Sequence, residues 1–173
     1  NKGFKPMVRE AAFDVSEMAI VTYLLAKSFD KPMVLLPDVV LARFQHGHAL
    51  LNAKAGKLSP RDLNGKRVGI RSFTTTTGAW LRGILANDHG VDLCSIDWVT
   101  FEDAHVAEYV DTTERAPAGK QIMQMLIDRE LDAVLADAAR FKRKKLGDQL
   151  KGKSIALVFF NPSMRTRTSF ELG

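Results

Sequence analysis

The stretch RVGIRSFTTTTGAWLRGILANDHG, residues 67–90, contains the pattern that decides the fold. Its first four residues, 67–70, form a largely apolar run of strand length, and apolar side chains recur at helical spacing between residues 80 and 85. The polar residues 72–78 lie between them and predict a turn into a helix, while Gly90 fits the left-handed residue that ends one. A strand, a turn and a helix in this order are the repeating unit of α/β domains.

Runs of strand length alternate with helical patterns along the rest of the chain as well. Further strands are expected at residues 33–36, 39–44, 96–101, 133–135 and 154–160. Further helices are expected at residues 14–27, 120–129 and 137–146, with a short helical turn that begins at Pro60. The first helix has Asp14 as its expected N-cap and Glu17 at the third helical position. The sequence therefore predicts an α/β fold with a mostly parallel sheet flanked by helices, in which the strands at 67–70, 96–101, 133–135 and 154–160 run parallel.

The composition is ordinary for a soluble globular protein. The chain has 173 residues, 46% hydrophobic and 26% charged, which suits one domain or one domain with a fragment of another. Cys94 is the only cysteine, so no intrachain disulfide can form, and a reducing, cytoplasmic location fits. No apolar run reaches 18 residues, so we expect no membrane span.

Basic residues cluster at 140–145 within a chain of net charge +5. Such a cluster is either a nucleic-acid patch or the solvated face of a helix. Phe141 is the one aromatic residue within this cluster, and a single ring does not make the stacking platform that bases require. We therefore expect a solvated helix face and no nucleic-acid partner.

The threonine-rich turn at residues 72–78 is a candidate anion site. Its hydroxyls and the free N–H groups of the helix that follows can bind a carboxylate or a phosphate. The same pattern also describes an N-capped helix with spare hydroxyls and no ligand. Spacing alone leaves both interpretations open.

The end of the chain has a second arrangement of this kind. An apolar run at 154–160 and a turn at Asn161 and Pro162 lead into SMRTRTSFELG, residues 163–173. A helix start offers N–H groups and a favourable dipole to an anion, and arginine adds forked, permanently charged donors that match phosphate oxygens. The tail therefore predicts a phosphate-binding site on a strand–turn–helix fragment.

The motif SMRTR ahead of TSFE resembles the carbamoyl phosphate motif of the aspartate/ornithine carbamoyltransferase family, and Met164 is typical of its N-acetylornithine branch. The resemblance implies that carbamoyl phosphate is bound by Ser163, Met164, Arg165, Thr166 and Arg167. It also implies carbamoyl transfer to an amine in arginine biosynthesis, and a homo-oligomer, because these enzymes share groups between subunits. The chain ends soon after the motif, so we expect weak phosphate binding and no transfer.

Four motifs in order resemble the 4,5-dihydroxyphthalate decarboxylase-like branch of the type II periplasmic-binding-protein fold. They are FDVSEM at 13–18, LARFQH at 41–46, SPRDL at 59–63 and VTFEDAHV at 99–106. In that fold two α/β lobes close on a small anionic ligand, here an aromatic carboxylate. The resemblance implies ligand contacts from Asp14, Ser16 and Glu17 on one side and from Thr74, Thr75, Thr76, Thr77 and Gly78 on the other.

Decarboxylation of an aromatic acid needs a bound carboxylate, a proton donor to the ring carbon and stabilisation of the carbanion-like state. The candidate catalytic residues are His46, Glu102 and His105. Glu102 and His105, with Asp103, could instead ligate a hard metal, and His46 and His48 on a strand would point both rings to one face. Both metal patterns are unspecific, and we expect neither a metal nor another cofactor.

The two resemblances meet near residue 137. We therefore expect an incomplete periplasmic-binding-protein-like domain at 1–136 and a carbamoyltransferase N-terminal fragment at 137–173, in a composite or fragmentary chain that begins at Asn1 without a methionine. Three functions stay open: an aromatic-acid decarboxylase, a carbamoyltransferase and a non-catalytic module that binds a small anion.

Overall fold

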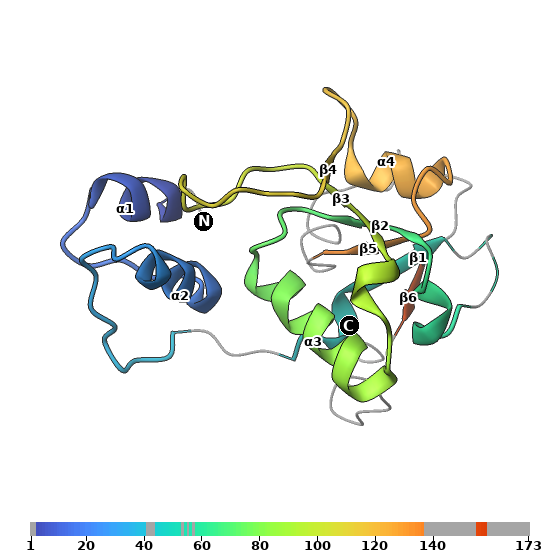
Figure 1. Ribbon diagram of the computed structural model, residues 1–173, viewed down its shortest axis with the longest axis horizontal. Coiled ribbons are helices and arrows are strands. Elements are labelled where there is room, and N and C mark those ends of the chain that lie inside the picture. The colour runs from blue at the N-terminus through green and yellow to red at the C-terminus, as the bar shows by residue number, and fades with distance from the viewer. Residues whose placement is uncertain are drawn as a thin grey trace.

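A computed structural model describes residues 3–40, 44–52, 54, 56, 58–136 and 155–158 of the chain. Its framework is a six-stranded sheet of order β4-β3-β2-β5-β1-β6 (Figure 1). The strands are β1 (Ala49–Asn52), β2 (Arg67–Ile70), β3 (Asp97–Thr100), β4 (Glu114–Arg115), β5 (Ala133–Leu135) and β6 (Ile155–Val158). The α-helices are α1 (Phe4–Glu10), α2 (Ile20–Ser28), α3 (Thr76–His89) and α4 (Ile122–Ile127). Short 3₁₀ helices lie at His46–His48, Pro60–Leu63 and Leu93–Ser95.

The sheet is mixed and mostly parallel. Strand β2 pairs in parallel with β3 and β5, and β3 pairs in parallel with β4. Strand β1 is antiparallel to both of its neighbours, β5 and β6, so those two strands run the same way. The four strands predicted to be parallel therefore share one direction, which confirms the predicted α/β class. The reversed strand between them, β1, was not predicted.

Helices cover both faces of this sheet. Alternate residues of β5 belong to different cores: Leu135 packs with Leu81 and Leu85 of α3, whereas Val134 packs with Met123 of α4. Figure 1 shows α3 and α4 on opposite sides of the strands. This alternation is the period of two that a strand covered on both faces requires.

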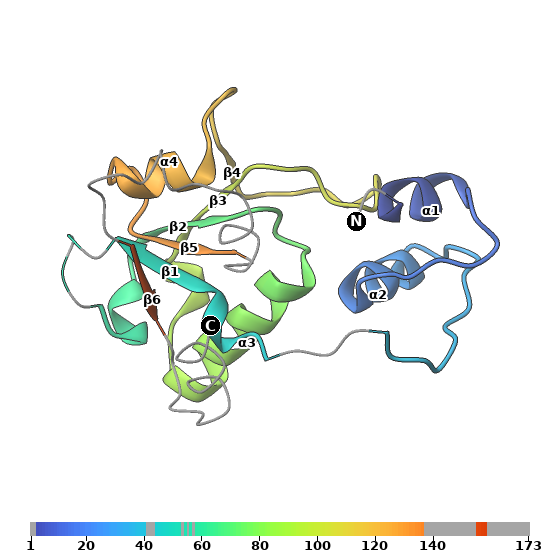
Figure 2. The same ribbon diagram turned by 180° about the vertical axis from the view of Figure 1, so that it is seen from behind.

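The N-terminal helices form a small unit of their own beside the sheet (Figure 2). Val8 of α1 and Ala26 of α2 pack against Val106, which lies in the long loop between β3 and β4. Arg9 strengthens this contact, because its Nε and Nη2 atoms donate to the carbonyls of His105 and Ala104 at 2.9 and 3.0 Å. The loop therefore joins α1 and α2 to the end of β3.

The predicted start of the first helix was wrong. Helix α2 begins at Ile20 with Ala19 as its N-cap, and the segment around Asp14 and Glu17 precedes it without helical structure. The free N–H of Val21 in the first turn donates to Thr76 Oγ1 at 3.2 Å. The first turn of α2 is thus satisfied in part by a side chain from another helix, and the capping box predicted at Asp14 and Glu17 does not form its start.

Two predicted strands were also wrong. Residues 33–36 are irregular, with Met33 partly buried and Val34 87% exposed, and Val39 and Val40 lie outside any strand as well. Pro32 and Pro37 lack the N–H that a central strand must donate, and the place in the sheet belongs instead to the fully buried β1. Residues 41–43 lie outside the described residues. The strand expected to carry both His46 and His48 is a 3₁₀ helix.

The locally specified elements match the prediction. The 3₁₀ helix Pro60–Leu63 has a reciprocal capping box between Ser59 and Asp62, and Gly90 ends α3 in the left-handed conformation. Strand β3 and helix α4 lie within their expected ranges, with α4 shorter at both ends. The basic helix expected at 137–146 lies outside the described residues, as does the tail at 159–173.

Candidate functional site

The turn between β2 and α3 places polar groups at the carboxyl end of the parallel strands. Thr75 is the N-cap of α3: its Oγ1 accepts from Gly78 N at 3.3 Å and donates to the Ser72 carbonyl at 3.0 Å. Ser72 itself is buried, only 4% exposed. In open α/β sheets this edge is where ligands bind, because the turns there hold helix N-termini around a common space.

The first turn of α3 leaves two backbone donors available. Within the described part of the chain, no acceptor lies against the N–H groups of Thr76 and Thr77, whereas Gly78 N is satisfied by the Thr75 side chain. Such N–H groups point out of the helix start and carry the positive end of its dipole. The turn therefore has two backbone donors that no described group of the chain satisfies.

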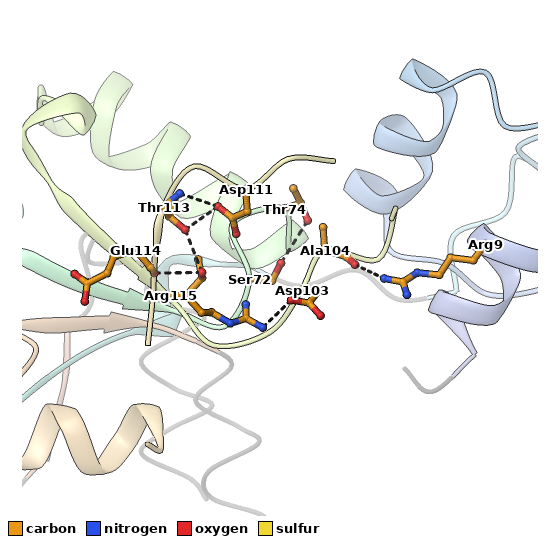
Figure 3. Close-up of polar contacts among 10 residues, drawn as sticks. Arg9, Ser72, Thr74, Asp103, Ala104, Asp111, Thr113, Glu114 and Arg115 are labelled. Carbon is orange, nitrogen blue, oxygen red and sulfur yellow. Dashed lines mark hydrogen bonds and ion pairs between the residues drawn. The ribbon is translucent and has the colours of Figure 1, made fainter. Parts of the chain in front are cut away.

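The loop between β3 and β4 stands next to this turn (Figure 3). Asp111 Oδ1 accepts from Thr113 N at 3.0 Å and from Thr113 Oγ1 at 2.7 Å, and Thr113 Oγ1 lies 3.1 Å from Thr100 Oγ1 at the end of β3. Asp111 Oδ2 is buried and has no hydrogen-bond partner among the described residues. A buried carboxylate oxygen without a donor costs free energy. The conformation of this loop therefore leaves one polar atom, Asp111 Oδ2, unsatisfied.

Arg82 of α3 contacts the turn through Phe73. Its guanidinium lies 3.7 Å from the centroid of the Phe73 ring, and its Nη1 donates to the Phe73 carbonyl at 2.6 Å. Burial lowers the pKa of Arg82, while the nearby Tyr109 and Asp111 oppose that shift. Because an arginine stays charged, it provides a fixed positive charge between the turn and the β3–β4 loop.

His105 is the contact point between the loop and the N-terminal helices. Its Nδ1 lies 2.7 Å from Thr22 Oγ1 of α2, and the ring of Phe4 meets it edge-on at a centroid distance of 5.6 Å. Burial lowers the pKa of His105, and the positive charges of Arg71, Lys5 and Arg9 lower it further against the opposing effect of Glu102. The imidazole is therefore neutral at pH 7 and serves as a hydrogen-bonded junction.

The predicted ligand site has two sides, the segment with Asp14, Ser16 and Glu17 and the threonine turn, and the structure joins them through other residues than these three. Asp14 and Glu17 are exposed, and Ser16 donates to the carbonyl of Glu17 at 2.9 Å. Among the described residues, no hydrogen bond joins these three to the threonine turn; the contact is made by Val21 N and Thr76 Oγ1. The start of α2 therefore faces the start of α3, with the predicted acidic residues in the segment just before it.

The structure brings together two of the three candidate catalytic residues. Glu102 and His105 lie on one loop next to Arg71, which forms an ion pair with Glu102 at 3.5 Å. His46 lies on a 3₁₀ helix, and its ring centroid is 6.5 Å from that of Phe44. Within the described residues, no hydrogen bond links His46 to Glu102 or His105.

Neither metal pattern assembles. The described residues contain no group of three or more His, Cys, Asp or Glu side chains able to hold a metal ion.

No described helix has the length and apolar character to cross a membrane.

Sequence reasoning missed three polar residues that organise this region: Thr22, Arg82 and Asp111. Only Asp111 had a local signal, since an Asp two residues before a Thr is typical of a side-chain-capped turn. Thr22 and Arg82 read as ordinary helix residues, and their partners His105 and Phe73 become visible only in three dimensions.

Comparison with known proteins finds two families in two parts of the chain. The family model described as "Aspartate/ornithine carbamoyltransferase, carbamoyl-P binding domain" matches residues 122–173. The N-acetylornithine carbamoyltransferase of Xanthomonas campestris pv. campestris is 84% identical over 44 residues, which is 25% of this chain and 13% of that protein. The resemblance of the C-terminal segment to carbamoyltransferases is thereby confirmed.

The second family covers more of the chain at lower identity. The 4,5-dihydroxyphthalate decarboxylase of Comamonas testosteroni is 29% identical over 141 residues, covering 76% of this chain and 43% of that protein. The Pseudomonas putida protein of the same name is 28% identical over 141 residues, with 76% of this chain and 55% of its own length covered. The chain thus spans about half the length of these relatives, and the predicted resemblance to them is confirmed.

The His105 junction predicts a pH-dependent stability. The folded state lowers the pKa of His105, so below the ordinary value of about 6.5 the unfolded chain binds more protons than the folded one. Stability is therefore fully present above pH 6.5 and falls as the pH drops below it. The urea midpoint should fall more between pH 7 and pH 5.5 in the wild type than in His105→Gln, by the linkage of at most one proton. Equal pH slopes in the two proteins would contradict the assignment.

Proposed function

We propose that residues 1–136 form an incomplete domain of the type II periplasmic-binding-protein kind that binds a small aromatic carboxylate at the start of α3. The observation that carries the proposal is the pair of available N–H groups of Thr76 and Thr77 at the carboxyl end of β2. Support comes from the mostly parallel sheet and from the similarity to 4,5-dihydroxyphthalate decarboxylases. Hydrogen bonds to a charged group contribute about 1.5–3 kcal/mol each, enough to select an anion.

The threonine turn is the proposed carboxylate side of the site, from Thr74 to Gly78. The proposed opposite wall is the segment that leads into α2, with Asp14, Ser16 and Glu17. The contact between Val21 and Thr76 supports this pairing, because it holds the two walls next to one another.

The proposed reaction is decarboxylation. The bond between the carboxylate carbon and the ring breaks and carbon dioxide leaves. The electron pair that remains on the ring carbon takes up a proton that comes from water and is passed on by a protein side chain. His46, Glu102 and His105 remain the proposed proton-handling residues. The loop with Glu102 and His105 is the better supported position, since Arg71 beside it supplies a positive charge for the developing carbanion.

A matched pair of variants tests the carboxylate contact. Thr76 is the first helical residue of α3, where proline is well tolerated, and Thr75 already has the extended backbone that precedes proline. Thr76→Pro removes the N–H and the hydroxyl, whereas Thr76→Val removes the hydroxyl alone. We expect calorimetry to show phthalate binding about tenfold weaker in Thr76→Pro than in Thr76→Val. Equal affinities would exclude the helix start as the site.

The reaction is tested separately from the binding. Release of carbon dioxide from 4,5-dihydroxyphthalate by the full chain would support the decarboxylase. Binding without release would favour the third function, a non-catalytic module for a small anion.

A second function is proposed for the C-terminal segment, residues 137–173. The carbamoyl-P binding family model matches residues 122–173, and the chain is 84% identical over 44 residues to an N-acetylornithine carbamoyltransferase. We propose that residues 163–167 bind carbamoyl phosphate. In carbamoyl transfer an amine attacks the carbamoyl carbon, the bond to the phosphate oxygen breaks, and Arg165 and Arg167 would stabilise the departing phosphate. The chain spans 13% of that relative, so transfer itself is a proposal that concerns the whole enzyme.

A further inference from the structure

Trp80 is a large aromatic side chain exposed on the second turn of α3. It is 58% exposed, whereas the other tryptophan, Trp98, is 8% exposed in the core beneath α3. Trp80 follows Thr76 by four positions and Thr77 by three, so all three share one face of the helix. Helical side chains lean toward the N-terminus and cover the turn before their own Cα. Trp80 is therefore on the side of α3 that carries Thr76 and Thr77, one turn after the two available N–H groups.

The neighbouring helix α2 also exposes apolar groups. Ile20 and Leu24 of α2 are 41% and 58% exposed and are spaced by one helical turn. Helices α2 and α3 contact one another through Val21 and Thr76, and both views of the fold show the two helices adjacent (Figures 1 and 2). An exposed tryptophan with further apolar side chains nearby is typical of a binding surface.

We propose that Trp80 determines the specificity of the anion site for aromatic acids. The N–H groups of Thr76 and Thr77 hold the carboxylate, and the indole of Trp80 provides a flat apolar surface for the ring to which the carboxylate is bonded. One helical turn, about 5.4 Å, separates the two contacts along the axis, and the backward lean of the tryptophan shortens that separation. This inference rests on the proposed function, and it adds the residue that distinguishes an aromatic acid from an aliphatic one.

Two ligands with the same charged groups separate the two contacts. Phthalate and maleate both present two neighbouring carboxylates, but only phthalate has an aromatic ring. In calorimetry, we expect the wild-type chain to bind phthalate about five- to tenfold more tightly than maleate, as aromatic pairing allows. Trp80→Ala should remove this preference and leave maleate affinity within about twofold, while the control Trp80→Phe should retain most of the preference. Thr76→Pro should weaken both ligands together.

Tryptophan fluorescence gives a second measurement. Phthalate should quench the wild-type emission and leave that of Trp80→Phe unchanged, because Trp98 is buried. A preference for phthalate that survives Trp80→Ala would overturn the role of Trp80 and leave the helix start intact, as would equal wild-type affinities for the two ligands. A wild-type chain that binds neither ligand would overturn the proposed function and this inference together. Trp80 is exposed, so circular dichroism should show both variants folded.

Discussion

Gly78→Ala should destabilise the chain by about 1–3 kcal/mol, while Gly83→Ala in the same helix should stabilise it by about 0.4–1 kcal/mol. A Cβ at Gly78 would lie 2.2 Å from Ile70 Cδ1 and 2.9 Å from Thr75 Oγ1. Ile70 is fully buried against α3, so its side chain has little room to turn away. At Gly83 the nearest atom is Asn87 Nδ2 at 4.0 Å, and alanine there gains helix propensity. Urea unfolding measures both changes.

The double variant Gly78→Ala, Ile70→Val checks the cause. Valine lacks the Cδ1 atom that the new methyl group meets, so it should recover part of the loss, although Ile70→Val alone costs about 0.5–1.5 kcal/mol. A loss that is simply additive would show that the close approach of α3 to β2 is not responsible. If the new methyl group of Gly78→Ala pushes the start of α3 away from β2, the N–H groups of Thr76 and Thr77 move with it. Phthalate binding should therefore also become weaker in Gly78→Ala.

The parts of the fold that could be predicted from sequence are those with local determinants. Strand β2, the turn and α3 follow one another with Thr75 as cap and Gly90 as terminator, and each signal acts within a few residues. Strand β1 and the irregular segment 33–36 show the opposite case. Both are short apolar runs, and only pairing with β5 and β6 determines that residues 49–52 enter the sheet. Such pairing depends on partners more than 80 residues away and leaves no local trace.

The candidate site was predictable to the same extent. The threonine turn was predicted as a candidate site because a helix start offers N–H groups to an anion by its own geometry. The start of α2 was placed wrongly because Thr76, 55 residues away, satisfies Val21. The contact of His105 with α2 likewise depends on Thr22, which is 83 residues away. Contacts of that range decide which polar residues meet, and the order of the residues along the chain does not reveal them.

Arg165→Ala should reduce the affinity of the full chain for carbamoyl phosphate by about tenfold or more. Arginine contributes forked, charge-assisted hydrogen bonds to phosphate oxygens, and each such bond is worth about 1.5–3 kcal/mol. The motif at 163–167 lies within the segment that matches the carbamoyl-P binding domain. Affinity should also fall with added salt, since the contact is ionic. Calorimetry with carbamoyl phosphate, and with inorganic phosphate as a stable stand-in, measures the change.

Lys142→Ala is the matched control for that variant. It removes the same single positive charge from the basic cluster at 140–145, outside the motif. If the anion were attracted only by the general positive charge of the chain, both variants would lose affinity to a similar small extent, because exposed charges beyond a Debye length of about 10 Å are screened. A specific site requires a large loss in Arg165→Ala and little change in Lys142→Ala. Equal losses would show that residues 163–167 do not form a phosphate site in this chain, although they lie within the segment that matches the carbamoyl-P binding domain.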